Sequence, residues 1–157
     1  MSNILPMLTT EGLVVDRYFS ELLNSGDFTK AEEILWPGFI FYGPSTPAGL
    51  DTRAFIHYIE GIRAAFSNKH FRELERIVEG NRVVIRFQMT GIQDGAFCGW
   101  PASGASIDVE GCDLIMLRDG KIAEVRAYFD LMSVIQRILI PPPVRAFGEL
   151  MEHLWRH

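Results

Sequence analysis

The sequence has few cysteines and lacks the residue clusters that build metal centres. Cys98 and Cys112 are its only cysteines, and neither has the spacing of a metal ligand. We therefore expect no metal site. We interpret both cysteines as reduced, buried thiols of a cytoplasmic protein, with a disulfide between them as the alternative.

Long apolar runs, targeting signals and phosphate-binding motifs are also missing. The longest apolar stretches fall far short of the roughly 20 residues that span a bilayer. The first residues lack the basic start and apolar run of a secretory signal, and there is no phosphate-binding glycine loop and no nucleophile elbow. A net charge of −5 argues against nucleic acid and anionic membranes as partners.

What the sequence does have is a generous supply of aromatic and apolar side chains. Hydrophobic residues make up 48% of the chain and charged residues 22%, which is typical of a globular protein. At 157 residues the chain is long enough for one domain with a real core. Its eleven Phe, four Tyr and three Trp could line a cavity as easily as fill that core.

The predicted elements come in the order of helices first and strands later. Apolar periodicity and turn signals predict helices over 10–23, 29–36, 51–66 and 131–140, and strands over 39–42, 71–78, 82–89, 106–117 and 121–130. The glycines and prolines of residues 43–49 predict a loop. This order favours an α+β fold in which helices pack on one face of a curved, antiparallel sheet.

The end of the chain is set apart by three consecutive prolines, Pro141 to Pro143. We divide the chain into a single α+β domain over 1–140 and a proline-rich hinge with an amphipathic helix over 141–157. That helix could pack on the body, close as a lid or contact a second subunit. Together with an exposed apolar sheet face, it leads us to expect a homodimer.

The segment 112–130 predicts a β-hairpin. Asp119-Gly120 lies between two apolar-rich runs, which is the strongest short-range signal for a hairpin. A two-residue turn would pair Arg118 with Lys121. Strand alternation then gives the second strand one apolar face and one polar face. The residues on the polar face are Ile122, Glu124, Arg126, Tyr128 and Asp130.

This polar face is where the sequence directs the search for chemistry. The same register sets Asp113 opposite Arg126, which an ordinary cross-strand ion pair explains more simply than catalysis does. A β-bulge would shift the pairing by one residue.

Asp130 follows the strand and precedes apolar residues, so we expect its carboxylate to be partly desolvated, with a raised pKa suited to proton transfer. The alternative is that Asp130 caps the helix that follows.

Two segments and the order of the helices are typical of one known family. One segment is Gly-x-Phe-x-Gly-x-Pro-x-x-Gly, which comprises Gly95, Phe97, Gly99, Pro101 and Gly104. The other is Arg-Asp-Gly-Lys-Ile, which comes before a last strand that ends in aspartate. In these features the chain resembles the SnoaL-like polyketide cyclases of the nuclear-transport-factor-2-like superfamily over about residues 10–137. This resemblance implies a cone-shaped α+β fold with the N-terminal helices on the concave face of the sheet.

The resemblance also implies an activity. In these cyclases the aspartate at the end of the last strand, here Asp130, is the acid/base of an intramolecular aldol closure that needs no cofactor. We expect a cofactor-free cyclase or isomerase of a hydrophobic polyketide-type or terpenoid-type molecule, in which Arg86 and Gln88 orient a substrate oxygen.

Two alternatives remain open. The segment Arg126-Ala127-Tyr128-Phe129-Asp130 also resembles the limonene-epoxide-hydrolase-like enzymes, which implies an epoxide hydrolase or an epoxide-opening cyclase. Gln88, however, stands where those enzymes have a second carboxylate, and glutamine cannot accept a proton in that way. The other alternative is a non-catalytic module that binds a small molecule. Further candidate substrate-binding residues are Tyr18, Phe41, Trp100, Asp113, Arg126 and Tyr128. For Tyr18, Trp100 and Tyr128 the simpler interpretation is core packing.

Overall fold

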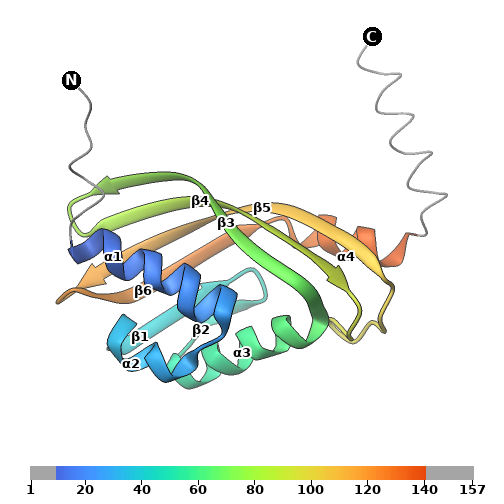
Figure 1. The fold of residues 1–157 in the computed structure, drawn as a ribbon, viewed down its shortest axis with the longest axis horizontal. Coiled ribbons are helices and arrows are strands. Elements are labelled where there is room, and N and C mark those ends of the chain that lie inside the picture. Colours follow the sequence, from blue (N-terminus) through green and yellow to red (C-terminus); the bar gives the residue numbers. More distant parts are fainter. Residues whose placement is uncertain (1–9, 141–157) are drawn as a thin grey trace, which may run out of the picture.

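The computed structural model describes residues 10–140, so the helix predicted after the three prolines lies outside the described residues. Six strands form one sheet in the order β2-β1-β6-β5-β4-β3 (Figure 1). Neighbouring strands are antiparallel, except that β1 runs parallel to β6. The strands are β1 (Leu35–Gly43), β2 (Thr46–Leu50), β3 (Phe66–Glu79), β4 (Arg82–Gln93), β5 (Ala105–Arg118) and β6 (Lys121–Phe129).

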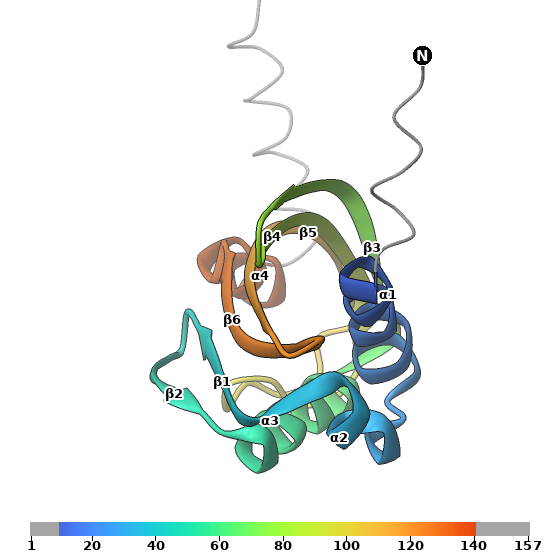
Figure 2. The same ribbon diagram turned by 90° about the vertical axis from the view of Figure 1, so that its left-hand side faces the viewer.

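The helices come mainly before the long strands, as the sequence predicts. They are α1 (Thr10–Arg17), which continues as the π-helix η2 (Tyr18–Ser25), the 3-10 turn η3 (Phe28–Lys30), α2 (Ala31–Ile34), α3 (Thr52–Ala65) and α4 (Leu131–Leu139). Figure 2 shows the curled sheet with α1, α2 and α3 on its concave side. The predicted α+β class and the helices on the concave face are therefore confirmed.

The concave face of the sheet holds the core because the long strands alternate. In β4 every second residue from Val83 to Gln93 is buried, including Ile85, Phe87 and Met89, and the residues between them are exposed or half-buried. Tyr18 and Leu22 of η2 and Phe55 of α3 are fully buried against this face. Removing this much apolar surface from water is the main favourable contribution to the stability of the fold.

The hairpin forms with the predicted turn but with a different register. Arg118 pairs with Lys121, and Asp119 and Gly120 both have positive φ, as a tight hairpin turn requires. A β-bulge between Met116 and Leu117 then shifts the ladder by one residue, with Ala123 as the extra residue. The predicted pairing of Asp113 with Arg126 is therefore wrong.

The shift changes what surrounds the carboxylate in β5. Asp113 faces Ala127, while Arg126 pairs with Leu114 and its guanidinium bonds to Glu124, with 2.7 Å between Nε and Oε1. No cross-strand ion pair forms between Asp113 and Arg126.

Two further predictions are corrected. Residues 46–50, which the sequence placed in a loop, form the edge strand β2, where a proline is tolerated because one side of the strand needs no partner. Both cysteines are free, but Cys98 is exposed and Cys112 is half-buried, so neither is the buried thiol that we expected.

Candidate active site

An apolar cavity lies between the concave face of the sheet and the helices η2 and α3. Its lining residues are Tyr18, Leu23, Phe41, Tyr58, Ile59, Ile62, Phe71, Phe87, Met89, Val109, Asp113, Ala127 and Phe129. The cavity has a volume of about 50 Å³, which is room for a few water molecules. Tyr58, Ile62, Phe71 and Phe129 are partly exposed and form the rim. A ring system would have to move some of these rim side chains to enter.

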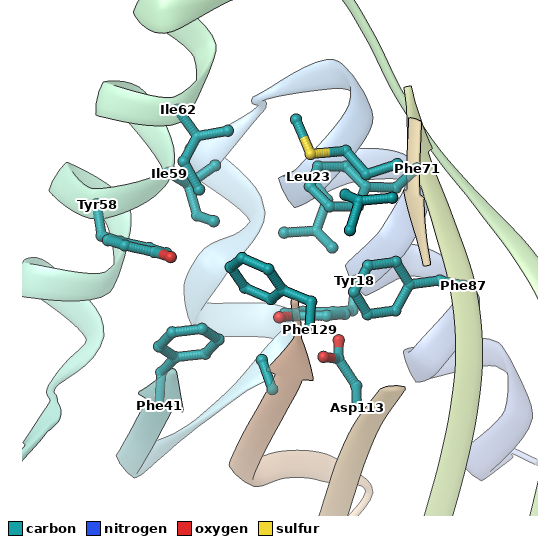
Figure 3. Close-up of a pocket in the computed structure, with 13 residues that line it drawn as sticks. Tyr18, Leu23, Phe41, Tyr58, Ile59, Ile62, Phe71, Phe87, Asp113 and Phe129 are labelled. Atoms are coloured by element: carbon teal, nitrogen blue, oxygen red, sulfur yellow. The ribbon is translucent and has the colours of Figure 1, made fainter. Parts of the chain in front are cut away.

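One carboxylate reaches into this cavity, and it belongs to Asp113. The residue is only 3% exposed, and its Oδ1 has no hydrogen-bond partner among the described residues. Figure 3 shows the carboxylate at one end of the cavity, below the ring of Phe129. Burial raises the pKa of Asp113 to about 7, because the charged form loses its hydration without gaining a cation.

Local sequence explains this placement. On β5, Asp113 occupies the same face as the buried Ile115 and Leu117, so strand alternation forces its side chain inward. Ala127, its partner on β6, is small and also lines the cavity. The carboxylate is therefore held among apolar groups and next to free space.

Two tyrosines direct their hydroxyl groups toward the same space (Figure 3). Tyr18 is 1% exposed, and its pKa is raised well above the usual value, first by burial and then by the charge of Asp113. Burial also raises the pKa of Tyr58. Both phenols therefore stay protonated at neutral pH and can donate hydrogen bonds to a ligand.

Asp130, which we expected to be the acid/base, lies at the start of α4. Asp130 is exposed and caps α4, and its carboxylate accepts hydrogen bonds from the backbone N–H of Ser133 at 3.0 Å and from the Ser133 hydroxyl. These bonds lower the pKa of Asp130, so the expected upward shift is wrong. The residue does not line the cavity, and its position is that of the helix cap considered as the alternative.

Arg86 and Gln88 also lie away from the cavity, on the convex face of β4. Arg86 is bonded to Glu75 at 3.1 Å and to Glu110 at 2.9 Å. Gln88 is bonded to Arg72 and Asp108. Strand alternation turns Phe87, between them, inward instead. The trio of Arg86, Gln88 and Asp130 is therefore not brought together.

Of the remaining predicted site residues, some line the cavity and others lie outside it. Tyr18, Phe41 and Asp113 line the cavity, as a substrate-binding role requires. Trp100 lies in the loop after β4 and is 44% exposed, and Tyr128 is 57% exposed on the convex face. The guanidinium of Arg126 stacks on Tyr42, with 4.1 Å between its Cζ and the ring centroid.

Sequence reasoning missed several lining residues, including Tyr58, Phe87 and Phe129. The alternation of β4 and the 3.6-residue spacing of α3 carried a signal for Phe87 and Tyr58, because both fall on the apolar face of their element. Among residues 10–140, no cluster of three or more His, Cys, Asp or Glu side chains could hold a metal ion. Nor is any helix in this part of the chain long and apolar enough to cross a membrane.

Comparison with protein families identifies the fold. Residues 13–138 match the model of the SnoaL-like polyketide cyclases. The chain belongs to this family. A comparison with curated proteins found no match.

Solved structures of similar proteins share the architecture. A candidate SnoaL-like polyketide cyclase from Jannaschia sp. CCS1 is 30% identical, with a TM-score of 0.79 over 90% of this chain and 100% of that one. IdmH, a candidate polyketide cyclase from Streptomyces antibioticus, is 17% identical, with a TM-score of 0.74 over 84% and 100% of the two chains.

A protein from Catenulispora acidiphila with a ketosteroid isomerase-like fold, solved with trimethylamine, is 15% identical. Its TM-score is 0.67 over 82% of this chain and 93% of that one. The likeness to this protein and to IdmH shows the fold alone. This SnoaL-like protein therefore has a ketosteroid isomerase-like α+β fold, and its family supports a cyclase-type role.

Proposed function

We propose that this SnoaL-like protein is a cofactor-free cyclase or isomerase of a hydrophobic, polyketide-type small molecule, with Asp113 as its general acid/base. The observation that carries the proposal is the carboxylate of Asp113, which is buried in an apolar cavity, has an unpartnered oxygen and has a pKa of about 7. A group with that pKa is present in both protonation states near neutral pH, so it can accept a proton and return it.

The chemistry follows from the groups in the cavity. The Asp113 carboxylate takes a proton from a carbon next to a substrate carbonyl, which leaves an enolate. The enolate carbon forms a bond to a second carbonyl carbon of the same molecule, and the resulting alkoxide takes the proton back from Asp113. The protonated hydroxyl of Tyr18 donates a hydrogen bond to the oxygen on which negative charge develops. The apolar walls hold the chain folded, so that the ring closes in a unimolecular step.

Proton abstraction can be measured without knowing the natural substrate. The aromatic ketone 2-tetralone exchanges its α-protons in D2O, and NMR reports the rate. We expect the protein to accelerate this exchange with a pH midpoint near 7, as the carboxylate ionises. Asp113→Asn should lower the catalysed rate by about 10²-fold or more, the usual contribution of a general base.

Asp130→Asn is the matched control, because it also removes a carboxylate but leaves the cavity intact and keeps a good capping residue. We expect this variant to retain the wild-type exchange rate. If only Asp130→Asn slowed the exchange, Asp130 and not Asp113 would be the acid/base. Equal exchange rates in the wild type and both variants would refute the role of Asp113.

The proposal extends to assembly, because the convex face of the sheet exposes large apolar side chains. Ile77 of β3 is 58% exposed, Leu114 of β5 is 41% exposed and Tyr128 of β6 is 57% exposed. Exposed apolar groups spread over neighbouring strands are typical of an interaction surface. The occupant that we propose is the same face of a second copy, in a homodimer.

A further inference from the structure

Two basic side chains meet at the C-terminal end of η2. Lys69 Nζ donates a hydrogen bond to the carbonyl oxygen of Leu23, and Arg63 donates one to the carbonyl oxygen of Asn24, both at 2.8 Å. They border an open hollow of about 290 Å³. The residues that line this hollow are Asn24, Arg63, Phe66, Ser67, Asn68 and Lys69.

The positive charge in this hollow is not neutralised by a carboxylate. Neither Arg63 nor Lys69 forms an ion pair with an acidic side chain anywhere in residues 10–140. Burial, and then the charge of Arg63, lowers the pKa of Lys69 to about 8. The acidic group of Asp94 nearby is engaged by the backbone N–H of Ser67, with 3.1 Å between N and Oδ1.

Lys69 has no pairing partner on β4, because the register of β3 is irregular at this point. The ladder between β3 and β4 shifts between Ser67 and His70, and Asn68 has a φ of 48°. Bulges of this kind re-aim side chains, and they are common next to functional sites. Cations are favoured at the C-terminal end of a helix, so Lys69 caps η2 through the carbonyl of Leu23 while its charge borders the hollow.

The hollow lies close to the rim of the apolar cavity, but the two have no lining residue in common. Leu23, Ile62 and Phe71 line the cavity at the end opposite to Asp113 (Figure 3). Asn24 and Arg63 directly follow two of these residues in the chain. Lys69 Nζ lies 5.6 Å from the centroid of the Phe71 ring, and this rim phenylalanine is half-buried. The cavity itself contains no Lys, Arg or His among its lining residues.

We propose that Arg63 and Lys69 form an anion subsite at the mouth of the cavity, so that the ligand is an aromatic or polyketide-type carboxylate. Its apolar rings lie in the cavity, and its carboxylate lies in the hollow. This inference rests on the proposed function, because the reacting carbonyl is then held at the Asp113 end. The guanidinium and ammonium groups replace the water that the carboxylate gives up.

Calorimetric titration with a matched pair of probes tests this subsite without any turnover. Naphthalene-2-carboxylate and its methyl ester share the ring system and differ in charge. We expect the acid to bind the wild-type protein about tenfold more tightly than the ester, with a preference that shrinks as salt is added. Lys69→Gln and Arg63→Gln keep a donor for the η2 carbonyls and remove the charge. Each should reduce the preference severalfold while the Kd of the ester stays unchanged.

Arg53→Gln is the control, because Arg53 is an exposed cation on the same helix as Arg63 and does not line the hollow. This variant should keep the full preference for the acid. Equal affinities for acid and ester in the wild type would overturn the subsite, as would a parallel loss of both in Lys69→Gln. Failure of both probes to bind would overturn the cavity as well. A preserved preference with no ketone exchange would leave the subsite standing and refute only the acid/base role of Asp113.

Discussion

Asp113 of β5 lies directly opposite Ala127 of β6, and both side chains face the same apolar cavity. The pair places a carboxylate beside the smallest side chain that a β-carbon allows, so free space lies where a larger partner would have packed. Asp113 and Ala127 are paired because the bulge at Ala123 shifts the register of the hairpin by one residue. Without that shift Asp113 would face Arg126, and an ion pair between them would hold the pKa of Asp113 low.

The first prediction concerns stability against pH. The folded pKa of Asp113, about 7, lies above the unfolded value of about 4. The native state therefore retains a proton that the unfolded state releases, and stability falls as the pH rises from about 4 to 7. Asp113→Asn removes this dependence. The difference in unfolding free energy between variant and wild type should grow in favour of the variant by about 1.4 kcal/mol per pH unit across that window.

Urea denaturation at half-unit steps from pH 4 to 8 measures this difference. A constant offset between the two proteins at every pH would show that Asp113 ionises in the native state as easily as in the unfolded chain. The proposed acid/base would then lose its physical basis.

The second prediction concerns Gly111, two residues before Asp113. A β-carbon at this position would lie 2.5 Å from Phe87 Cζ and 2.9 Å from the backbone oxygen of Tyr128. Gly111→Ala should therefore destabilise the protein by about 1–3 kcal/mol, the usual cost of overpacking. Gly61→Ala is the control, because a β-carbon there meets nothing within 4 Å on helix α3. It should stabilise the protein by roughly 0.5–1 kcal/mol, and equal effects of the two changes in thermal or urea unfolding would contradict this account.

Much of the fold could be predicted because it depends on local patterns. Helix α3 begins after the capping residue Asp51, and β4 shows its alternation in the sequence itself. The turn at Asp119-Gly120 was recognisable from its residue types. Strand β2 was not, because its glycine and proline are typical of loops and only its pairing with β1 makes it a strand.

The site was harder to predict, because it depends on a bulge that no local signal marks. The extra residue Ala123 shifts β6 by one position, so that Ala127 and not Arg126 lies opposite Asp113. Asp130 looked desolvated because apolar residues follow it, but the start of a helix offered its carboxylate hydrogen-bond donors instead. Apolar neighbours in the sequence therefore do not predict a buried carboxylate. The strand face on which an aspartate lies predicts its burial better, as Asp113 shows.

The third prediction tests Asp130 as a structural cap. Asp130→Ala removes the acceptor for the Ser133 N–H and should lower the melting temperature by a few degrees, whereas Asp130→Asn should be close to wild type. The folded pKa of Asp130 is depressed, so its contribution is present above the unfolded value of about 4 and is lost as the pH falls through the lower folded value. The effect of Asp130→Ala on melting should therefore shrink in acid. An equally large effect at pH 2 and at pH 7 would contradict a role for the ionised carboxylate.

The last prediction concerns the proposed homodimer. Leu114 and Tyr128 lie on neighbouring strands of the convex face, 41% and 57% exposed. Leu114→Glu or Tyr128→Glu would place a charge in the interface, where the carboxylate would be desolvated without a partner. Each variant should therefore sediment as a monomer in sedimentation velocity, whereas the wild type should sediment as a dimer. Leu13→Glu changes an equally apolar residue, 50% exposed on α1, and should leave the dimer intact. A wild-type protein that sediments as a monomer at micromolar concentration would refute the proposal, and dissociation by Leu13→Glu alone would move the interface to α1.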